Sequence, residues 1–472
     1  MARGDQRRRG RHGSDQEQHG AHEAGDADAD AGAASAQDNV RVWVDELSEK
    51  GKATRLHGLG MLADHLRRQP ASHAGAGEGK DAAGLEGTLD TLLRAVPSLL
   101  RNKASEAEFT ACCRLVEVLA LVLGTEGKRA LFVETYDPLR AAVGKDGKTA
   151  VRTGAAIRAL AMLAALCSED DGPFWATMEQ AEALIADYVA DEPKVAALQA
   201  WGFLASLADG AELRARTPAL RAIFAPLLAH ECPDVRADAG ENLAMLIAMD
   251  RDADDAEDDE DEEESEEDKE KASTPNASST EAESKVVEQG LEVEDASQFV
   301  TSSTIENGDP DAELVATLED LAHQNEKNVT KRSLREQRAR FRDILGSVRD
   351  GVDPELKLSL DKVSVQLEGW SELKRAGYLR DVLGEGLEAH TKVNAGVQSL
   401  LNLRGKHLDE SYFAADGHLV GTDGAAFYGS CARVAANKQR NRSRHKARDH
   451  REAIKSDFLH AEASGGDVLT AE

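Results

Sequence analysis

The sequence VRTGAAIRALAMLAAL at residues 151–166 aligns with two later stretches, KVAALQAWGFLASLAD at 194–209 and DVRADAGENLAMLIAM at 234–249. The first valines of successive stretches lie 44 and 40 residues apart. A small residue follows each valine at +5 and an apolar residue follows at +12. A period of this length with this inner-helix pattern predicts HEAT or armadillo-like helical repeats, in which the small residues let neighbouring helices approach closely.

Two earlier segments carry the same helical pattern. KATRLHGLGMLADHLR begins at Lys52 and resembles a divergent first repeat, and TACCRLVEVLALVLG surrounds Cys112 as the buried helix of another. Alanine and leucine are frequent throughout this part of the chain, and both lose little conformational freedom on entering a helix. We therefore predict an all-α fold, with a HEAT/armadillo-like solenoid over residues 39–326.

Acidic and basic residues are segregated along the chain. It holds 57 Lys and Arg against 87 Asp and Glu, a net charge of −30. Asp250–Asp268 is acidic at 15 of its 19 positions, so we expect it to stay extended by self-repulsion. The predicted order is a disordered N-terminal tail (1–38), helical repeats (39–326) interrupted by an acidic disordered loop (250–308), a C-terminal domain (327–410), a linker (411–430), a basic helix (431–458) and a disordered tail (459–472).

The stretch TKRSLREQRARFRDILGSV, residues 330–348, lies between the acidic segment and the C-terminal part. Its apolar residues form a narrow stripe of helical period, and the remaining surface is rich in arginine. We predict that the stripe packs on protein, with a structural seam formed by Phe341, Ile344, Leu345 and Trp370. Two roles stay open for Arg335, Arg338 and Arg342, namely phosphate contacts or an ion-pair row against the acidic domain. A solvated charged helix is the third interpretation.

The hydrophobic period changes after this helix. Leucines alternate at residues 356–360, and valines and a leucine alternate at 363–367, on either side of Asp361-Lys362. Alternation on both sides of a two-residue turn predicts a short β-hairpin. Helical spacing returns at Trp370 and ends at Gly384, where a glycine suits the C-terminal cap of a helix.

The same residues resemble a known family. KRSLREQRARFRDIL from Lys331 and KLSLDKVSVQLEGWSELKRAGYLRDVLGEGLEAH from Lys357 resemble the C-terminal region of the interferon-related developmental regulator family. PDVRADAGENLAML from Pro233 resembles the last repeat of its armadillo-like helical region. The resemblance implies that fold and a regulatory role. Members of the family are described both as transcriptional co-regulators and as factors on idle ribosomes, with a tail helix in the messenger path.

A basic tail follows, and FYGSCARVAANKQRNRSRHKARDHREA from Phe427 resembles the family's C-terminal tail. Three interpretations remain for it: a nuclear-import signal, an anchor on ribosomal RNA, or a solvated tail. Arginine suits phosphate through its planar fork and suits base faces through stacking. The predicted RNA-contacting residues of the tail are Arg433, Lys438, Arg440, Arg442, Arg444, Lys446, Arg448 and Arg451.

Several functional classes are not expected. The chain has no Gly-rich phosphate loop and no HExxH, GxSxG or kinase motif set, so we expect no enzyme, no small-molecule substrate and no cofactor. Its five cysteines include no CxxC pair, so we expect no metal site, and their number suits reduced thiols in the cytosol or nucleus. No run approaches the length of a membrane span.

Two functions compete at this stage. The first is a non-enzymatic protein that binds ribosomes and ribosomal RNA through the basic helix and silences or stores non-translating ribosomes. The alternative is a nuclear co-regulator scaffold, whose solenoid binds transcription or deacetylase-complex proteins and whose tail is an import signal. Both imply protein partners on the solenoid surface, and together they predict a cytoplasmic and nuclear protein.

Overall fold

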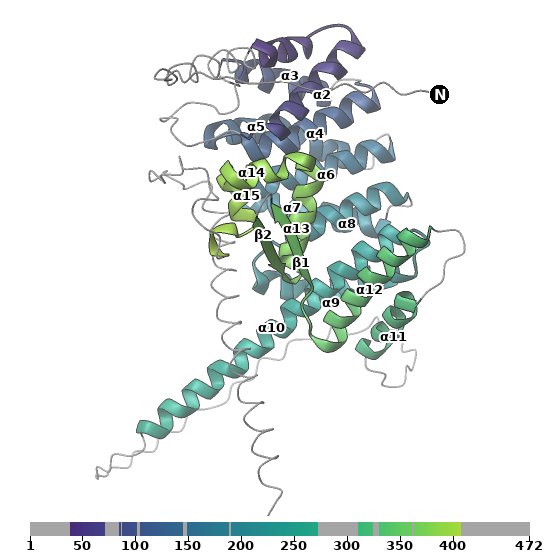
Figure 1. Cartoon of the computed structure of the whole chain (residues 1–472), viewed down its shortest axis with the longest axis vertical. Coiled ribbons are helices and arrows are strands. Elements are labelled where there is room, and N and C mark those ends of the chain that lie inside the picture. Colours follow the sequence, from purple (N-terminus) through teal and green to yellow (C-terminus); the bar gives the residue numbers. More distant parts are fainter. Residues whose placement is uncertain are drawn as a thin grey trace, which may run out of the picture.

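The computed structural model describes residues 38–70, 85, 87–101, 104–144, 149–187, 190–271, 310–323, 330–360 and 363–406. Residues 38–46 are helical and precede a stack of helices arranged in two rows (Figure 1). The first row consists of α2 (Lys52–Arg68), α4 (Glu106–Val122), α6 (Ala150–Leu166), α8 (Asp191–Ala205) and α10 (Pro233–Lys271). The second row consists of α3 (Leu89–Arg101), α5 (Thr125–Val143), α7 (Asp171–Asp187) and α9 (Gly210–Phe224), which continues into the 3₁₀ helix η1 (Ala225–Ala229).

Each helix of the first row packs on the next one, and the second row covers one side of it. Because α4, α6 and α8 lie between neighbours, they are apolar around most of their circumference. The small residues predicted to allow close approach, Ala156, Ala200 and Gly240, are all buried. The predicted armadillo/HEAT-like helical solenoid is therefore confirmed.

Local sequence signals begin several of these helices. Ser105 caps α4 with a capping box, in which its hydroxyl accepts from the Glu108 amide and the Glu108 carboxylate accepts from the Ser105 amide. Thr149 and Asp209 cap α6 and α9 in the simpler way. Each cap satisfies amide groups that the first turn of a helix leaves without a partner.

The acidic segment differs from expectation at its start. We expected an extended chain from residue 250 onward, but α10 runs on to Lys271 and extends beyond the body of the molecule (Figure 1). The turns of α10 before this point are packed on α8 and α9, so the helix needs no new nucleus to continue. Residues 272–308, the rest of the predicted loop, lie outside the described residues.

The next two helices extend the solenoid. α11 (Pro310–His323) packs on α12 (Lys331–Asp350), and α12 packs on α10. Arg340 of α12 donates to Asp238 of α10. Further along both helices, Arg251 of α10 donates to the backbone carbonyls of Ser347 and Val348 of α12. The two helices therefore run in the same direction. In this packing α12 is the next helix of the first row. The start of a C-terminal domain at residue 327 stays a prediction.

The predicted hairpin is confirmed. β1 (Glu355–Leu360) pairs with β2 (Val363–Glu368) in antiparallel register, with Leu360 opposite Val363. The predicted helix from Trp370 is confirmed as α13 (Gly369–Leu383), and Gly384 ends it at a φ of +56°, which favours glycine. Then follow η2 (Gly384–Gly386), α14 (Leu387–Val393), α15 (Ala395–Leu400) and η3 (Leu403–Gly405).

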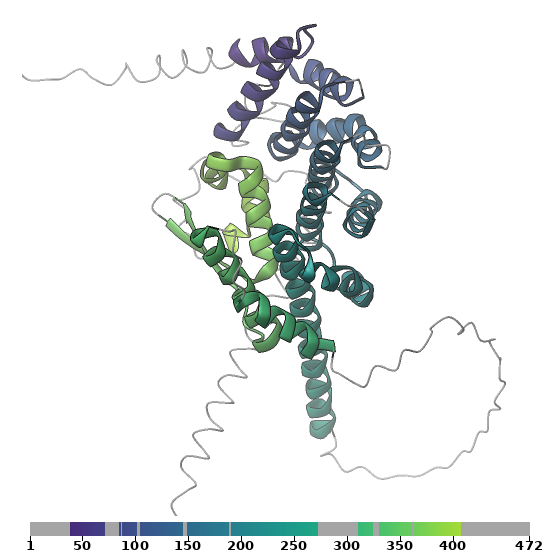
Figure 2. The same cartoon turned by 90° about the vertical axis from the view of Figure 1, so that its right-hand side faces the viewer.

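Residues 352–406, which we term the C-terminal unit, turn back along the solenoid. Figure 2 shows this unit lying inside the curve of the stacked helices. α13 contacts α4, α8 and α10, and α14 contacts α2. One hydrophobic core joins the unit to the repeats. The concave side of the solenoid is therefore partly filled by the chain's own C-terminal unit.

Candidate functional site

α12 is fixed at both ends and along one face. Thr330 caps its first turn, and Gly351 ends it in the left-handed region at a φ of +68°. Phe341 and Ile344 are fully buried against α10, where a Cβ added to Gly240 would lie 3.0 Å from Ile344 Cδ1 and 3.7 Å from Phe341 Cε1. Gly240 therefore permits the close approach of the two helices.

The other two residues of the predicted seam are also buried. Leu345 is 7% exposed and Trp370 is 5% exposed. The indole Nε1 of Trp370 donates to Ser347 Oγ at 2.9 Å, which ties the start of α13 to α12. The four residues thus lie where α12 meets α10 and the C-terminal unit.

The opposite side of α12 carries a line of basic residues. At about 100° per residue, the line occupies a sector about 60° wide and about 27 Å long. We term it the basic line, and it consists of Lys331, Arg335, Arg338, Arg342 and Arg349. Lys331, Arg335, Arg342 and Arg349 are exposed, and Arg338 is half-buried. The acidic residues of α12, Glu336, Asp343 and Asp350, fall outside this sector.

Contacts with described residues orient two arginines of the line. The Nε of Arg342 donates to the carbonyl of Arg338 at 3.3 Å, which orients the Arg342 side chain along the helix. At the far end, Arg349 pairs with Glu319 at 3.1 Å and with Asp350 at 2.9 Å. The exposed side chains of Lys331, Arg335 and Arg342 therefore present positive charge to solvent on a rigid helix.

A different arginine of α12 makes the ion pairs. Arg340 bonds to Glu241 Oε1 at 2.7 Å and to Asp238 Oδ1 at 2.8 Å, both on α10. Burial works to lower the pKa of Arg340, but the two carboxylates outweigh it and raise that pKa. The sequence pattern does not distinguish Arg340 from the other arginines of α12. The available signal is its position directly before Phe341, which places it at the edge of the apolar stripe.

The same acidic pair holds the C-terminal unit. Lys374 of α13 bonds to Glu241 Oε2 at 2.8 Å, and burial of Glu241 is outweighed by Lys374 and Arg340, which lower its pKa. The aliphatic part of Lys374 passes over Gly202, where an added Cβ would lie 3.2 Å from its Cδ. One carboxylate thus joins α10, α12 and α13.

One turn further along α13, Tyr378 enters the groove between α6 and α8. Its ring stacks on Phe203 with centroids 4.4 Å apart, and its hydroxyl donates to the Arg158 carbonyl at 2.7 Å. The Arg158 guanidinium lies 3.8 Å from Glu117 and 3.5 Å from Asp381. Burial raises the pKa of Glu117 to about 7 despite Arg158. α13 is therefore held in the groove through charged and aromatic side chains.

The last contacts of the C-terminal unit lie at helix ends. His390 Nε2 lies 3.1 Å from the Leu66 carbonyl at the end of α2, and Asn394 Nδ2 donates to the Leu121 carbonyl near the end of α4 at 3.0 Å. Both carbonyls belong to last turns, which leave acceptors unpaired within the helix. Burial lowers the pKa of His390, which favours the neutral ring that accepts from Asn394 at Nδ1.

The tail residues Arg433, Lys438, Arg440, Arg442, Arg444, Lys446, Arg448 and Arg451 lie outside the described residues. Cys112 and Cys167 are buried, and burial raises the pKa of each thiol to about 12. In the part of the chain that the structure covers, no three His, Cys, Asp or Glu side chains are grouped to hold a metal ion. No helix in that part is both long and apolar enough to cross a bilayer.

The sequence of this chain matches the model of a known protein family. The model of the interferon-related developmental regulator family matches residues 9–349, from the N-terminal tail to the end of α12. This chain belongs to that family. The match covers the solenoid and the basic line, whereas the resemblance expected for the hairpin, α13 and the basic tail falls outside the matched range. Among curated protein sequences, none matches this chain.

The solved structures similar to this chain include three engineered proteins. A designed armadillo repeat protein is 14% identical, covers 65% of this chain and 98% of its own, and has a TM-score of 0.35. Two engineered proteins of the Northeast Structural Genomics Consortium are 14% and 16% identical, with TM-scores of 0.36 and 0.35. They cover 66% and 89% of this chain, and 97% and 83% of their own. The fold assignment rests on the helix packing described above.

Proposed function

We propose that this member of the interferon-related developmental regulator family is a non-enzymatic regulator that binds ribosomes through ribosomal RNA and silences or stores non-translating ribosomes. The observation that carries the proposal is the basic line on α12. Arg335, Arg338 and Arg342 form its central part and, in this proposal, contact phosphate groups. Arg340, which lies outside this line, pairs with Asp238 and Glu241 of α10.

The chemistry of the line suits RNA. From Lys331 to Arg342, successive members are three or four residues apart, so their attachment points lie about 4.5–6 Å apart along the helix. Each guanidinium can bind a phosphate through two parallel hydrogen bonds. The chain carries a net charge of −30, so a polyanion is repelled by most of its surface and attracted to the basic line.

The rigid mounting of α12 favours binding. Phe341, Ile344 and the Arg340 ion pairs fix the helix on α10, so the points at which the arginines are attached are already in line before a partner arrives. Preorganised groups lose less conformational entropy on binding than groups on a flexible segment. The basic tail from Arg433 to Lys455 supplies a second and longer contact in this proposal.

Sedimentation through sucrose gradients with purified ribosomes tests the proposal. We expect full-length protein to move with ribosomes at low salt and to leave them steeply as salt rises. Alanine at Arg335, Arg338 and Arg342 should reduce the slope of log affinity against log salt by about two units, since each lost phosphate contact contributes about 0.7–0.9. Deleting 431–458 should weaken binding further.

A matched control removes the same charge elsewhere. Arg94, Arg101 and Arg129 are exposed on α3 and α5, far along the chain from α12, and alanine at all three should leave sedimentation unchanged. If the full-length protein stays at the top of the gradient at low salt, ribosome binding is refuted. If both triple variants lose binding equally, the effect reflects overall charge and the basic line has no special role.

The second candidate is a nuclear co-regulator scaffold. The observation that favours it is that the C-terminal unit leaves part of the first row of helices, at α2, α4 and α6, open on the concave side. In this case the solenoid binds transcription or deacetylase-complex proteins and the tail imports the protein. Deletion of 431–458 would then change nuclear import alone, and ribosome sedimentation would be absent.

A further inference from the structure

The basic line follows a straight path on one face of α12. Three exposed members of its first part, Lys331, Arg335 and Arg342, lie within about 16 Å along the helix axis. No proline or glycine lies between Lys331 and Arg342, so the helix has no sharp kink there. A ligand that meets these three cations must therefore follow a straight path.

Acidic residues border the line. Glu336, Asp343 and Asp350 follow one another at intervals of seven residues, so they form a second row parallel to the line, about 90–130° around the helix from its centre. From α11, Glu319 bonds to Arg349 at the far end of the line at 3.1 Å. The positive strip is therefore narrow, and negative charge lies beside it.

Cations of α12 outside the line are held by carboxylates. Arg332 bonds to Glu336 at 2.9 Å on the exposed surface. Arg340 bonds to Asp238 and Glu241 of α10. α12, which the structure describes in full, therefore offers no unpaired cation outside the line to a second strand of phosphates.

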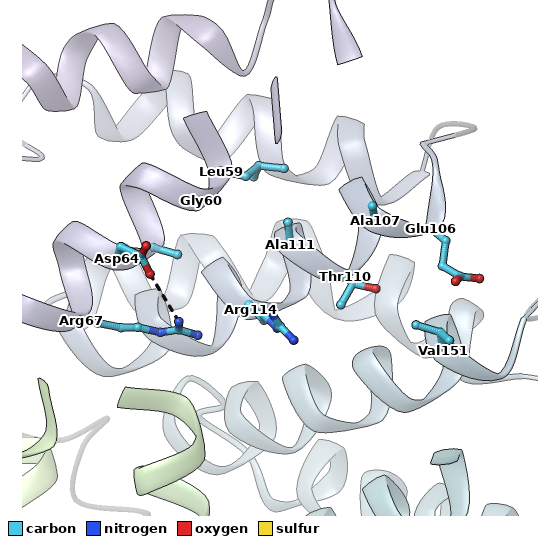
Figure 3. Close-up of a pocket in the computed structure, with 11 residues that line it drawn as sticks. Leu59, Gly60, Asp64, Arg67, Glu106, Ala107, Thr110, Ala111, Arg114 and Val151 are labelled. Atoms are coloured by element: carbon cyan, nitrogen blue, oxygen red, sulfur yellow. Dashed lines mark ion pairs between the residues drawn. The ribbon is translucent and has the colours of Figure 1, made fainter. Parts of the chain in front are cut away.

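A cavity of about 510 Å³ between α2, α4 and α6 shows the contrast. Arg67 and Arg114 line it, but so do Asp64 and Glu106, and Arg67 pairs with Asp64 at 3.6 Å (Figure 3). Charges of both signs side by side cancel and do not attract a polyanion. The basic line carries one sign of charge in single file, so it is the better site for a chain of phosphates.

We propose that the basic line binds a single, unpaired strand of RNA along the axis of α12 and discriminates against an RNA double helix. The inference rests on the proposed function, in which RNA is the ligand, and it specifies which kind of RNA is bound. An extended strand places successive phosphates along a straight path, so Lys331, Arg335 and Arg342 meet different phosphates of one strand.

The surface next to the line gives the strand room to approach. Ala339 and Gly346 lie about 60–80° around the helix from Lys331, between the line and the acidic row. A Cβ added to Gly346 would meet no neighbouring atom within 4 Å. The sugar groups of a bound strand can therefore lie over these two small residues while its phosphates contact the cations.

A double helix fits this surface less well for two reasons. Each strand of a duplex winds around the duplex axis, so it leaves a straight row of cations after a short arc. The second strand then lies over the surface that carries Glu336 and Asp343, where its phosphates are repelled. A single strand avoids both costs, because its flexible backbone can straighten along α12.

Fluorescence anisotropy with the full-length chain tests the preference. The probes are a fluorescein-labelled uridine decamer, which forms no duplex with itself, and an RNA duplex of the same length. The variant carries alanine at Lys331, Arg335 and Arg342. We expect it to bind the uridine strand about tenfold more weakly than the parent, with a salt slope smaller by about two units, and to bind the duplex with less than about a twofold change.

Each probe is compared between parent and variant, so RNA contacts made elsewhere in the chain are common to both and cancel. The matched control carries alanine at Arg94, Arg101 and Arg129, which are exposed on α3 and α5. This control should leave both affinities unchanged. Thermal unfolding of the two variants shows whether the fold is intact.

Three results would overturn the proposal. The first is that the variant binds the uridine strand as tightly as the parent does. The second is that the variant loses at least as much affinity for the duplex as for the uridine strand. The third is that labelled polyglutamate of similar charge binds the parent and loses as much affinity in the variant as the uridine strand does, which would assign the line to an acidic protein segment.

Ribosome sedimentation of the same proteins keeps the two proposals separate. If the parent moves with ribosomes but the variant loses duplex and single strand equally, the strand preference fails and the ribosome proposal stands. If the variant loses only the uridine strand but the parent stays at the top of the gradient, the ribosome proposal fails and the strand preference stands.

Discussion

The two sides of α12 use arginine in opposite ways. Arg340 lies at the edge of the buried side and is held by Asp238 and Glu241 of α10. Arg335 lies five residues earlier on the exposed side, within a sector that contains no acidic residue of the helix. The difference shows that the role of an arginine in such a helix follows from its angular position. The buried side should govern stability and the exposed side should govern binding.

Among substitutions on the buried side of α12, we expect Phe341→Ala to cause the largest loss of stability. Phe341 is fully buried against Gly240, and the substitution leaves a cavity that the rigid backbones of α10 and α12 cannot fill. We expect the free energy of unfolding to fall by about 3–5 kcal/mol. Urea denaturation followed by circular dichroism measures it, and a loss below about 1 kcal/mol would mean that α12 is not anchored by this side chain.

Next in size is Arg340→Ala. It leaves the buried carboxylate of Asp238 without its closest cation, while Glu241 keeps Lys374. Removing one partner of a fully buried pair costs about 3 kcal/mol, but the Arg340 side chain is 37% exposed and solvent screens the pair, so we expect a loss of about 2 kcal/mol. The matched variant is Arg335→Ala on the same helix, and equal losses for the two variants would erase the distinction between the sides.

The buried carboxyl group of Glu117, near Arg158 and α13, makes the stability of the fold depend on pH. Burial raises the pKa of Glu117 from its ordinary value near 4.5 to about 7, so the folded state holds this proton more tightly than the unfolded state. The resulting stabilisation is complete below about pH 4.5 and is lost as pH rises through about 7. Relative to Glu117→Gln, the native chain should lose up to about 3 kcal/mol over this range.

Paired urea titrations of the two proteins between pH 4.5 and 8 measure that difference. Other titrating groups, including His390, are common to both proteins and cancel. A difference in stability that does not change with pH would show that Glu117 stays ionised throughout.

The smallest effect on stability belongs to the exposed side. Arg335→Ala should change the free energy of unfolding by less than about 0.5 kcal/mol, because surface substitutions away from caps and ion pairs do little. The same change should lower ribosome affinity and its dependence on salt. Differential scanning calorimetry and gradient sedimentation check the two halves of this prediction, and a large loss of stability would place Arg335 with the structural residues.

The sequence predicted those features that depend on neighbours along the chain. The repeat period predicted the solenoid, the alternation across Asp361-Lys362 predicted the hairpin, and Gly384 marked the end of α13. The extent of α10 was not predicted, since an acidic run alone favours an extended chain, whereas here it continues a helix that is already formed and packed. The domain boundaries and the RNA-contacting residues stay predictions, and those of the tail lie outside the described residues.

What the amino-acid sequence determined by itself was a repetitive, helical chain with an arginine-rich helix after an acidic segment, because hydrophobic period and helix caps act over a few residues. Only the tertiary structure decided which arginine is structural and that the C-terminal unit fills part of the groove. Those contacts join residues 99, 220 and 324 positions apart, as in Arg340 with Glu241, Tyr378 with Arg158 and His390 with Leu66. Their partners are set by how the repeats stack and curve, and local sequence periodicity carries no record of that geometry.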